Sequence, residues 1–208
     1  MSLFVKLCGI KTEADLETAV DAGADAVGFV LTPSPRQISL SQAGHLNGLL
    51  PDHVLGVAVF HEPSPHLLRR TLEEVRPALF QSETATLVGL TPDRILPVVA
   101  DGDHLGRRID EAAAVTTREW VLVDSSARGG TGRPVSRARL AQLATSAKMI
   151  LAGGLDQENV AEVVAAIKPF GVDVSSGIER SPGEKDPGQM RSFVAAARAS
   201  LPLAGGAR

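Results

Sequence analysis

The sequence predicts a single α/β domain built as an eight-stranded parallel barrel. Apolar runs of strand length recur eight times along the 208 residues. Several of these runs are continuously apolar, as expected for strands that are buried on both faces of a parallel sheet. Each run is followed by a helix or a helix-length segment, and this regular alternation is typical of a (β/α)8 barrel. An open, doubly wound sheet fits the alternation nearly as well.

The predicted strands are often rich in Val and Ile and are spread over nearly the whole chain. In order they are Phe4–Leu7, Ala26–Leu31, Val54–Phe60, Ala78–Phe80, Ile95–Ala100, Trp120–Val123, Met149–Ala152 and Val172–Val174. The weakest stretch is Leu79–Leu90, where the fourth strand and its helix must both be short. We expect the barrel to occupy residues 1–202 and residues 203–208 to form a frayed tail.

Helix starts lie between these strands. The segment Thr12-Glu13-Ala14-Asp15 resembles a capping box, and the helix that it opens is expected to stop at Gly23. Three further helices are predicted to begin at polar residues, namely at Ser64 with Pro65, at Ser136 and at Asp156.

Composition narrows the classes of function. Hydrophobic residues make up 44% and charged residues 22%, and the net charge is −3 with both signs mixed along the chain. There is no basic block for a nucleic acid and no apolar run near the roughly 18 residues that span a bilayer. The N-terminus shows no secretory signal pattern, and one cysteine cannot form an internal disulfide. These observations predict a cytoplasmic protein with neither a nucleic acid nor a membrane as its partner.

Two strand ends carry candidate acid–base groups, because ligands of parallel α/β folds bind beyond the carboxyl ends of the strands. Cys8 follows the first strand and is either a buried packing group or a nucleophile or base. Asp124 follows the sixth strand and is either a loop cap or an acid whose pKa is raised by partial burial.

The later strand ends carry a candidate phosphate site. Gly153 and Gly154 let the backbone approach an anion closely, and Ser176 and Gly177 lie at the end of the next strand. Phosphate sites between the seventh and eighth strands recur in barrels, although a glycine pair also simply forms tight turns. The chain has no GxxxxGK[ST] and no GxGxxG sequence, which disfavours a nucleoside triphosphate or dinucleotide.

An arginine and the five histidines are the remaining candidates for binding a ligand or a metal. Arg36, in the Pro-rich loop after the second strand, offers a planar fork to a carboxylate or phosphate, or else is an ordinary surface residue. The histidines show no metal-ligand spacing, so no metal is expected. His61, near the end of the third strand, is the only histidine that we single out.

Taken together, these segments resemble the phosphoribosylanthranilate isomerase family of the tryptophan pathway. The match covers nearly the whole chain in order, and the combination is more specific than any one piece. It rests on Lys6–Ile10, Gly28–Val30, Ser34–Ser39, Gly56–Phe60, Asp124-Ser125, Gly129–Gly132, Leu151–Asp156, Asp173–Glu179 and Pro182–Asp186.

The resemblance implies a (β/α)8 TIM barrel that catalyses an Amadori rearrangement of a phosphorylated small molecule without a cofactor. By family role, Cys8 would be the general base and Asp124 the general acid. Arg36 would hold the anthranilate carboxylate, and the phosphate would lie against Gly153, Gly154, Ser176 and Gly177. Asp173 is a weaker candidate for contact with a sugar hydroxyl. The chain is expected to be a monomer or a homodimer.

The chain departs from the family pattern in two places. Leu79–Glu83 stands where many members have Gln-Leu-His-Gly, and Val135–Arg137 replaces an aromatic-Asp-Trp run. Gln81 is a candidate to take over the hydrogen bond of the missing histidine. Two alternatives stay open: a dual-substrate isomerase that also serves histidine biosynthesis, and a barrel that binds phosphometabolites without catalysis. Relatives in histidine biosynthesis carry a carboxylate where this chain has Cys8.

Overall fold

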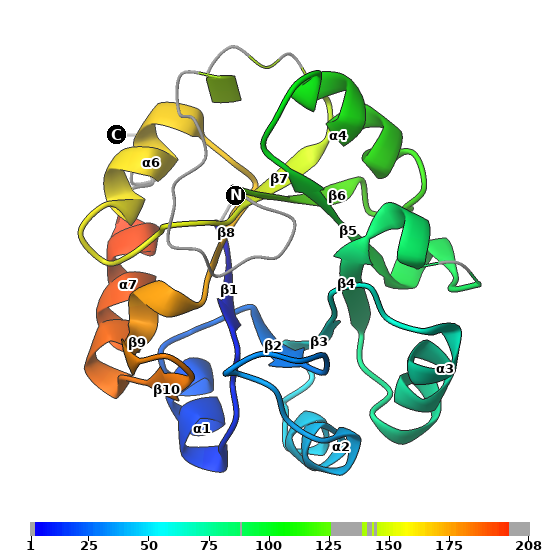
Figure 1. Ribbon diagram of the computed structural model, residues 1–208. Coiled ribbons are helices and arrows are strands. Elements are labelled where there is room, and N and C mark those ends of the chain that lie inside the picture. The colour runs from blue at the N-terminus through cyan, green and yellow to red at the C-terminus, as the bar shows by residue number, and fades with distance from the viewer. Residues whose placement is uncertain (1–2, 88, 126–138, 141–142, 144, 200–208) are drawn as a thin grey trace.

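The computed structural model describes residues 3–87, 89–125, 139–140, 143 and 145–199. Eight parallel strands close into a barrel in chain order, and β8 pairs back onto β1. Figure 1 shows the strands gathered at the centre with the helices arranged around them. The predicted (β/α)8 barrel is therefore confirmed, and the open doubly wound sheet is excluded.

The barrel strands agree with the apolar runs of the sequence. Seven of the eight have both ends within one residue of the predicted ends, and the fourth differs. They are β1 (Phe4–Cys8), β2 (Ala26–Val30), β3 (Leu55–Val59), β4 (Leu79–Glu83), β5 (Ile95–Ala100), β6 (Trp120–Asp124), β7 (Lys148–Leu151) and β8 (Gly171–Val174).

The helices begin at the kinds of residue that cap helices. Thr12 and Asp15 form the predicted capping box at the start of α1, and Ser64 accepts the backbone N–H of Leu67 at the start of α3. Gly23 follows α1 with a φ of 86°. The helices are α1 (Glu13–Asp21), α2 (Leu40–Gly48), α3 (Pro65–Glu74), α4 (Leu105–Ala113), α6 (Val160–Ile167) and α7 (Pro187–Ala199).

The predicted end of the fourth strand at Phe80 is wrong, whereas the helical structure after that strand is short, as expected. β4 has five residues, and its polar half from Gln81 to Glu83 pairs with Leu96 to Val98 of β5. Ladder hydrogen bonds with β5 keep these polar residues extended, although they break the apolar run. Among the described residues that link β4 to β5, helical structure is limited to the single turns Thr84–Thr86 and Pro92–Arg94.

The predicted helix start at Asp156 is also wrong, because α6 begins at Val160. The Asp156 side chain accepts hydrogen bonds from the backbone N–H groups of Glu158 and Asn159 at 2.9 Å, and Asn159 Oδ1 accepts the N–H of Asp156 at 3.1 Å. These bonds close a separate turn before the helix, since Asp and Asn side chains readily bond to nearby backbone.

A small antiparallel hairpin after β8 was not predicted. The single turn Ser176–Ile178 leads into β9 (Glu179–Ser181), which pairs with β10 (Glu184–Lys185). The hairpin lies beside α7 and α1 in Figure 1. Gly183, at its turn, packs so closely on the carbonyl of Pro35 that no side chain fits there. The hairpin therefore contacts the loop that carries Arg36.

Two hydrophobic clusters stabilise the barrel. One lies between the strands and the outer helices and includes Val5, Phe29 and Phe193. The other fills the barrel interior with one side chain from most strands, such as Phe4, Val57, Leu79, Leu96, Leu122 and Ile150. Because the interior below the site is packed with side chains, any ligand must bind at one end of the barrel.

Four sequence-based expectations lie outside the described residues. They are the helix start at Ser136, the Gly129–Gly132 segment, the Val135–Arg137 departure and the frayed tail at residues 203–208. No helix in the described part of the chain is long and apolar enough to cross a membrane.

Candidate active site

A cavity of about 810 Å³ opens at the carboxyl ends of the strands. Its lining brings together seven of the eight residues to which the sequence gives a catalytic or binding role, which are Cys8, Arg36, Asp124, Gly153, Gly154, Asp173 and Ser176. Gly177 is not among the described lining residues. It packs instead against the carbonyl of Leu155, in a contact that leaves no room for a Cβ atom. Gly177 thus joins the ends of β7 and β8.

The two candidate acid–base groups face this cavity from different sides of the barrel. Cys8 ends β1 and is 6% exposed, and Asp124 ends β6 and is 7% exposed. Strands β7 and β8 lie between them in the barrel order. Ser125 Oγ donates a hydrogen bond to Asp124 Oδ1 at 3.1 Å. The thiol and the carboxyl group are therefore placed to act on two different atoms of one ligand.

The thiol of Cys8 is surrounded by buried charges. Burial raises the pKa of Cys8 above its ordinary value, and the cations of Lys6 and Lys185 oppose this effect without overcoming it. This direction of the pKa shift gives no support to a thiolate in the free site. The role of Cys8 as a base stays a prediction.

Lys6 contacts the cavity residue Asp173, and the sequence pattern predicted no role for this lysine. It lies two residues before Cys8 in β1, is fully buried, and places Nζ 2.7 Å from Asp173 Oδ1. Burial alone would lower the pKa of Lys6, but Asp173 and Cys8 outweigh burial and raise it. The sequence held one signal of this ion pair, which is a lysine inside the apolar run Phe4–Cys8, because a buried lysine needs a partner.

Asp173 lines the cavity with one carboxylate oxygen bound to Lys6. Its proposed contact with a sugar hydroxyl stays a prediction.

The glycine pair at the end of β7 adopts the backbone that its residue type allows. Gly153 and Gly154 have φ angles of 85° and 66°, a region that other residues rarely occupy. Asn159 donates its side-chain N–H to the carbonyl of Gly154 at 2.9 Å and holds the turn. Both glycines line the cavity together with Ser176, which follows the neighbouring strand β8. The binding of phosphate by this turn stays a prediction.

His61, two residues after β3, and Gln81 of β4 add polar side chains to the cavity wall. His61 Nδ1 lies 3.0 Å from Glu83 Oε1, and both side chains are partly exposed. Gln81 lines the cavity, and its buried Oε1 has no hydrogen-bond partner in the described part of the chain. That atom can accept a hydrogen bond from a ligand, although its replacement of a histidine stays a prediction. Among the described residues, no cluster of His, Cys, Asp and Glu could hold a metal ion.

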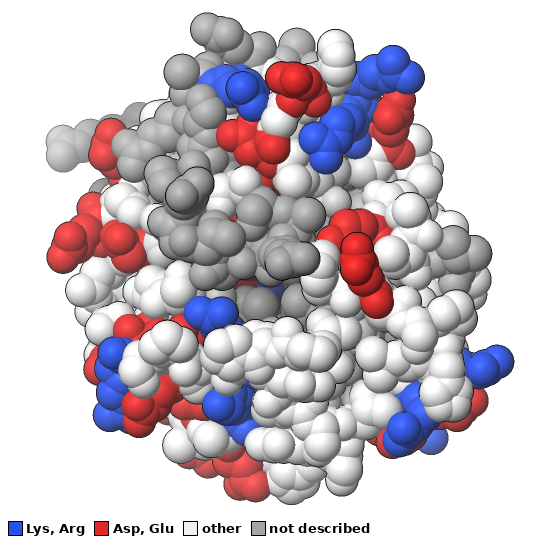
Figure 2. Space-filling view, viewed as in Figure 1, with Lys and Arg blue, Asp and Glu red and all other residues white. Residues whose placement is uncertain are grey.

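Charged residues are mixed around the face seen in Figure 2. Lys and Arg alternate with Asp and Glu along its rim and form no single basic patch on the described part of that face. This distribution gives no support to a nucleic-acid surface there.

The fold and the cavity define a (β/α)8-barrel enzyme with its site at the carboxyl ends of the strands. The family model described as "N-(5'phosphoribosyl)anthranilate (PRA) isomerase" matches residues 5–196. The chain belongs to this family.

Other members of this family match the present chain over nearly their full length. The N-(5'-phosphoribosyl)anthranilate isomerase of Rhodopseudomonas palustris strain BisB18 is 36% identical, with 98% of this chain and 99% of the relative covered. The crystal structure of phosphoribosyl anthranilate isomerase from Thermus thermophilus superposes with a TM-score of 0.79 at 30% identity, covering 95% of this chain and 99% of that one.

A second solved structure contains a ligand. It is a phosphoribosyl anthranilate isomerase in complex with reduced 1-(o-carboxyphenylamino)-1-deoxyribulose 5-phosphate. Its TM-score is 0.74 at 32% identity, and the match again covers 95% of this chain and 99% of that one.

Proposed function

We propose that this protein catalyses the Amadori rearrangement of N-(5'-phosphoribosyl)anthranilate in tryptophan biosynthesis. The product is 1-(2-carboxyphenylamino)-1-deoxyribulose 5-phosphate. The observation that carries the proposal is one cavity that holds Cys8 and Asp124 on different strands, together with Arg36 and the Gly153-Gly154 turn. The membership of the chain in the isomerase family supports the substrate.

The residue types suit each step of the rearrangement. Asp124 in its protonated form gives a proton to the ring oxygen of the ribose, which opens the ring and leaves a Schiff base at C1. Cys8, acting as the thiolate, then removes the proton from C2. The electron pair of that C–H bond forms the C1=C2 double bond, and the electron pair of the Schiff base moves to nitrogen to give the enolamine. Tautomerisation of the enolamine gives the aminoketone. No electrons leave the substrate, so acid–base groups suffice and no cofactor is proposed.

The binding groups hold the two ends of the substrate. Arg36 binds the anthranilate carboxylate, and Gly153, Gly154 and Ser176 surround the phosphate. Gly177 contributes to this phosphate site through its backbone, next to Ser176. Asp173 contacts a sugar hydroxyl through Oδ2, the carboxylate oxygen that does not bind Lys6. Held at both ends, the ribose lies between Cys8 and Asp124.

Steady-state turnover of freshly made N-(5'-phosphoribosyl)anthranilate, followed by the loss of its fluorescence, tests the proposal. The aminoimidazole-carboxamide ribotide of histidine biosynthesis is assayed in parallel. Turnover of the anthranilate compound alone supports the proposal, and comparable turnover of both supports the dual-substrate alternative. Binding without turnover of either compound contradicts catalysis and favours a binding barrel.

Two properties of the whole protein belong to the same proposal. We place it in the cytoplasm, which rests on its composition and on its single cysteine. We also propose that it is a monomer or a homodimer. Light scattering on the purified protein decides between these two states, and a larger mass contradicts both.

A further inference from the structure

Arg36 is held along one edge by a carboxylate from the far end of the chain. Its Nε and Nη2 atoms each lie 2.8 Å from one oxygen of Glu179, in a bidentate pair. The side chain of Arg36 is 12% exposed and that of Glu179 is 3% exposed. A two-point contact of this kind fixes the plane of the guanidinium group as well as its position.

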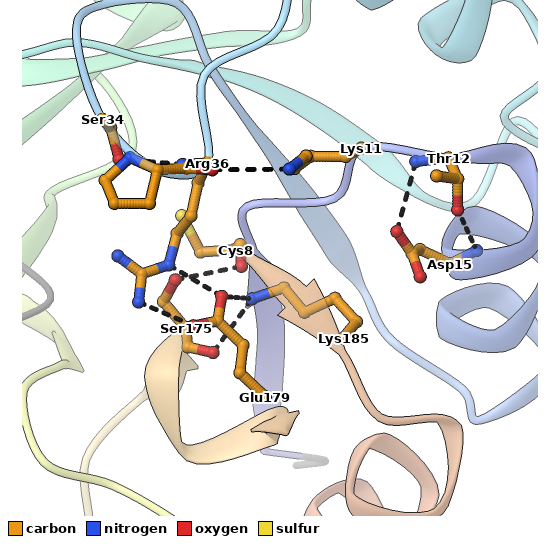
Figure 3. Close-up of polar contacts among 10 residues, drawn as sticks. Cys8, Lys11, Thr12, Asp15, Ser34, Arg36, Ser175, Glu179 and Lys185 are labelled. Atoms are coloured by element: carbon orange, nitrogen blue, oxygen red, sulfur yellow. Dashed lines mark hydrogen bonds and ion pairs between the residues drawn. The ribbon is translucent and has the colours of Figure 1, made fainter. Parts of the chain in front are cut away.

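Lys185 holds the same carboxylate from the other side. Its fully buried Nζ lies 2.7 Å from Glu179 Oε1 and donates to the carbonyl of Ser175 at 2.9 Å. Figure 3 shows Glu179 between the two cations, with Cys8 beside them. Two positive groups on one carboxylate leave a net charge of +1, and substrate carboxylate is the complement of that charge.

The bidentate pair leaves part of Arg36 available for a ligand. A guanidinium group has five N–H donors, and Glu179 uses one on Nε and one on Nη2. In the described part of the chain, Nη1 makes no hydrogen bond or ion pair, and Figure 3 shows it pointing away from Glu179. Because Arg36 lines the cavity, the edge formed by Nη1 and Nη2 is a second fork that can receive a carboxylate.

The backbone around this pair is fixed by the same hairpin. Glu179 begins β9 and Lys185 ends β10, and the two residues pair across the strands. Gly183 at the turn packs on the Pro35 carbonyl, and Lys11 donates to that carbonyl at 3.4 Å. The hairpin therefore holds both the side chain of Arg36 and the loop that carries it.

We propose that Glu179 and Lys185 are positioning residues that orient Arg36 toward a substrate carboxylate and thereby set the preference for carboxylated aromatic substrates. The inference rests on the proposed function, in which Arg36 binds the anthranilate carboxylate. Glu179 and Lys185 act through Arg36 and do not take part in proton transfer.

A positioning role and a purely electrostatic role of Glu179 predict opposite effects of its removal. Glu179→Gln removes one negative charge and so raises the net charge of the cluster by one, and a purely electrostatic role therefore predicts tighter binding of a carboxylate. A positioning role predicts weaker binding, because Arg36 and Lys185 lose their common anion and repel each other. Glu179→Asp keeps the charge and shortens the side chain by one methylene, so only a positioning role predicts a loss.

The test compares two ligands by isothermal titration calorimetry. One is reduced 1-(o-carboxyphenylamino)-1-deoxyribulose 5-phosphate, and the other is the same compound without its carboxylate. Glu179→Gln and Lys185→Met are expected to weaken binding of the carboxylated ligand at least about tenfold and binding of the other ligand less than about twofold. The affinity of Glu179→Asp for the carboxylated ligand is expected to lie between the affinities of these variants and that of the wild type. Glu184→Gln, an exposed position in the same hairpin, is the matched control and leaves both affinities unchanged.

Retained binding of the uncarboxylated ligand shows that each variant is folded. Equal weakening of both ligands, no change, or tighter binding of the carboxylated ligand by Glu179→Gln would overturn the inference. Arg36→Ala separates it from the proposed function. If that variant keeps the preference for the carboxylated ligand, the role of Arg36 itself is wrong. If Arg36→Ala removes the preference and Glu179→Gln keeps it, only the positioning role is wrong.

Discussion

Lys6 and Asp173 form a buried ion pair across β1 and β8, with Nζ 2.7 Å from Oδ1, next to the thiol of Cys8. Their side chains are 0% and 8% exposed. Pairs of this kind seldom add net stability, because desolvation offsets their attraction. The loss of one partner, however, leaves the other charge buried and uncompensated. The pair is therefore placed to keep a permanent cation beside Cys8.

Lys6→Met is expected to lower the free energy of unfolding by about 3–5 kcal/mol, because Asp173 is left as an uncompensated buried anion. Urea denaturation measures the change. Lys148→Met, at a partly exposed lysine that begins β7, is the control and should stay within about 0.5 kcal/mol of wild type. The double variant Lys6→Met/Asp173→Asn should recover part of the loss. Equal midpoints for Lys6→Met and the control would contradict the role of the pair.

The reactivity of Cys8 is expected to rise with pH beyond the range of an ordinary thiol. Burial raises its pKa, so alkylation by iodoacetamide should increase about tenfold per pH unit without levelling near pH 8.5. Because the folded state holds this proton more tightly, Cys8 contributes stability below the ordinary thiol pKa. That stability is lost as the pH rises through the folded value. A plateau in the alkylation rate below about pH 8 would show that the cations outweigh burial.

Cys8→Ala is expected to lower kcat by at least about 100-fold, since a positioned general base commonly contributes a factor of this size or more. Binding of the reduced product analogue should stay nearly intact, because the thiol is small and is not one of the binding groups. Asp124→Asn should behave in the same way if it removes the acid. Normal turnover by Cys8→Ala would remove the thiol from the mechanism.

Arg36→Ala is expected to raise KM at least about tenfold and to change kcat far less, because a carboxylate clamp contributes mainly uniform binding. Steady-state kinetics with N-(5'-phosphoribosyl)anthranilate separate the two constants. Arg107→Ala, on the exposed face of α4, serves as the control and should change neither. A fall in kcat alone would mean that Arg36 acts in the chemistry.

The sequence predicts the barrel and the cavity residues well because both follow from local patterns. Strands buried on both faces leave continuous apolar runs, and the rule that sites lie at strand ends then selects Cys8 and Asp124. The contacts between site residues that are distant in the chain do not follow from local patterns. Glu179 lies 143 positions from Arg36 in the chain, so only the closed barrel and the β9–β10 hairpin bring them together.

Two failures have local causes that outweigh the pattern. The end of β4 is polar but is held extended by its pairing with β5, so hydrophobicity alone ended the predicted strand too early. Asp156 looks like a helix cap, yet its side chain closes a turn with Glu158 and Asn159 before the helix begins. In both cases hydrogen bonds that hydrophobic patterning does not encode decide the outcome.

Gly28 is expected to be essential for the space that Cys8 and Lys6 occupy. It pairs with Cys8 across β1 and β2, and a Cβ atom there would lie 2.8 Å from Cys8 Sγ and 3.1 Å from Lys6 Nζ. The same atom would lie 3.2 Å from the Cα atom of Cys8, which belongs to the backbone of β1 and cannot move alone. Gly28→Ala should therefore displace the thiol.

We expect Gly28→Ala to cost about 1–3 kcal/mol of unfolding free energy, as overpacking of a core does. Turnover should fall about tenfold or more in protein that is still folded, because the base is misplaced. Gly48→Ala, at the end of α2, has no atom within 4 Å of the added methyl group and should be neutral or slightly stabilising. Denaturation and steady-state kinetics on both variants make the comparison. If Gly28→Ala matches Gly48→Ala in both measurements, the contact of Gly28 with the thiol does not constrain the site.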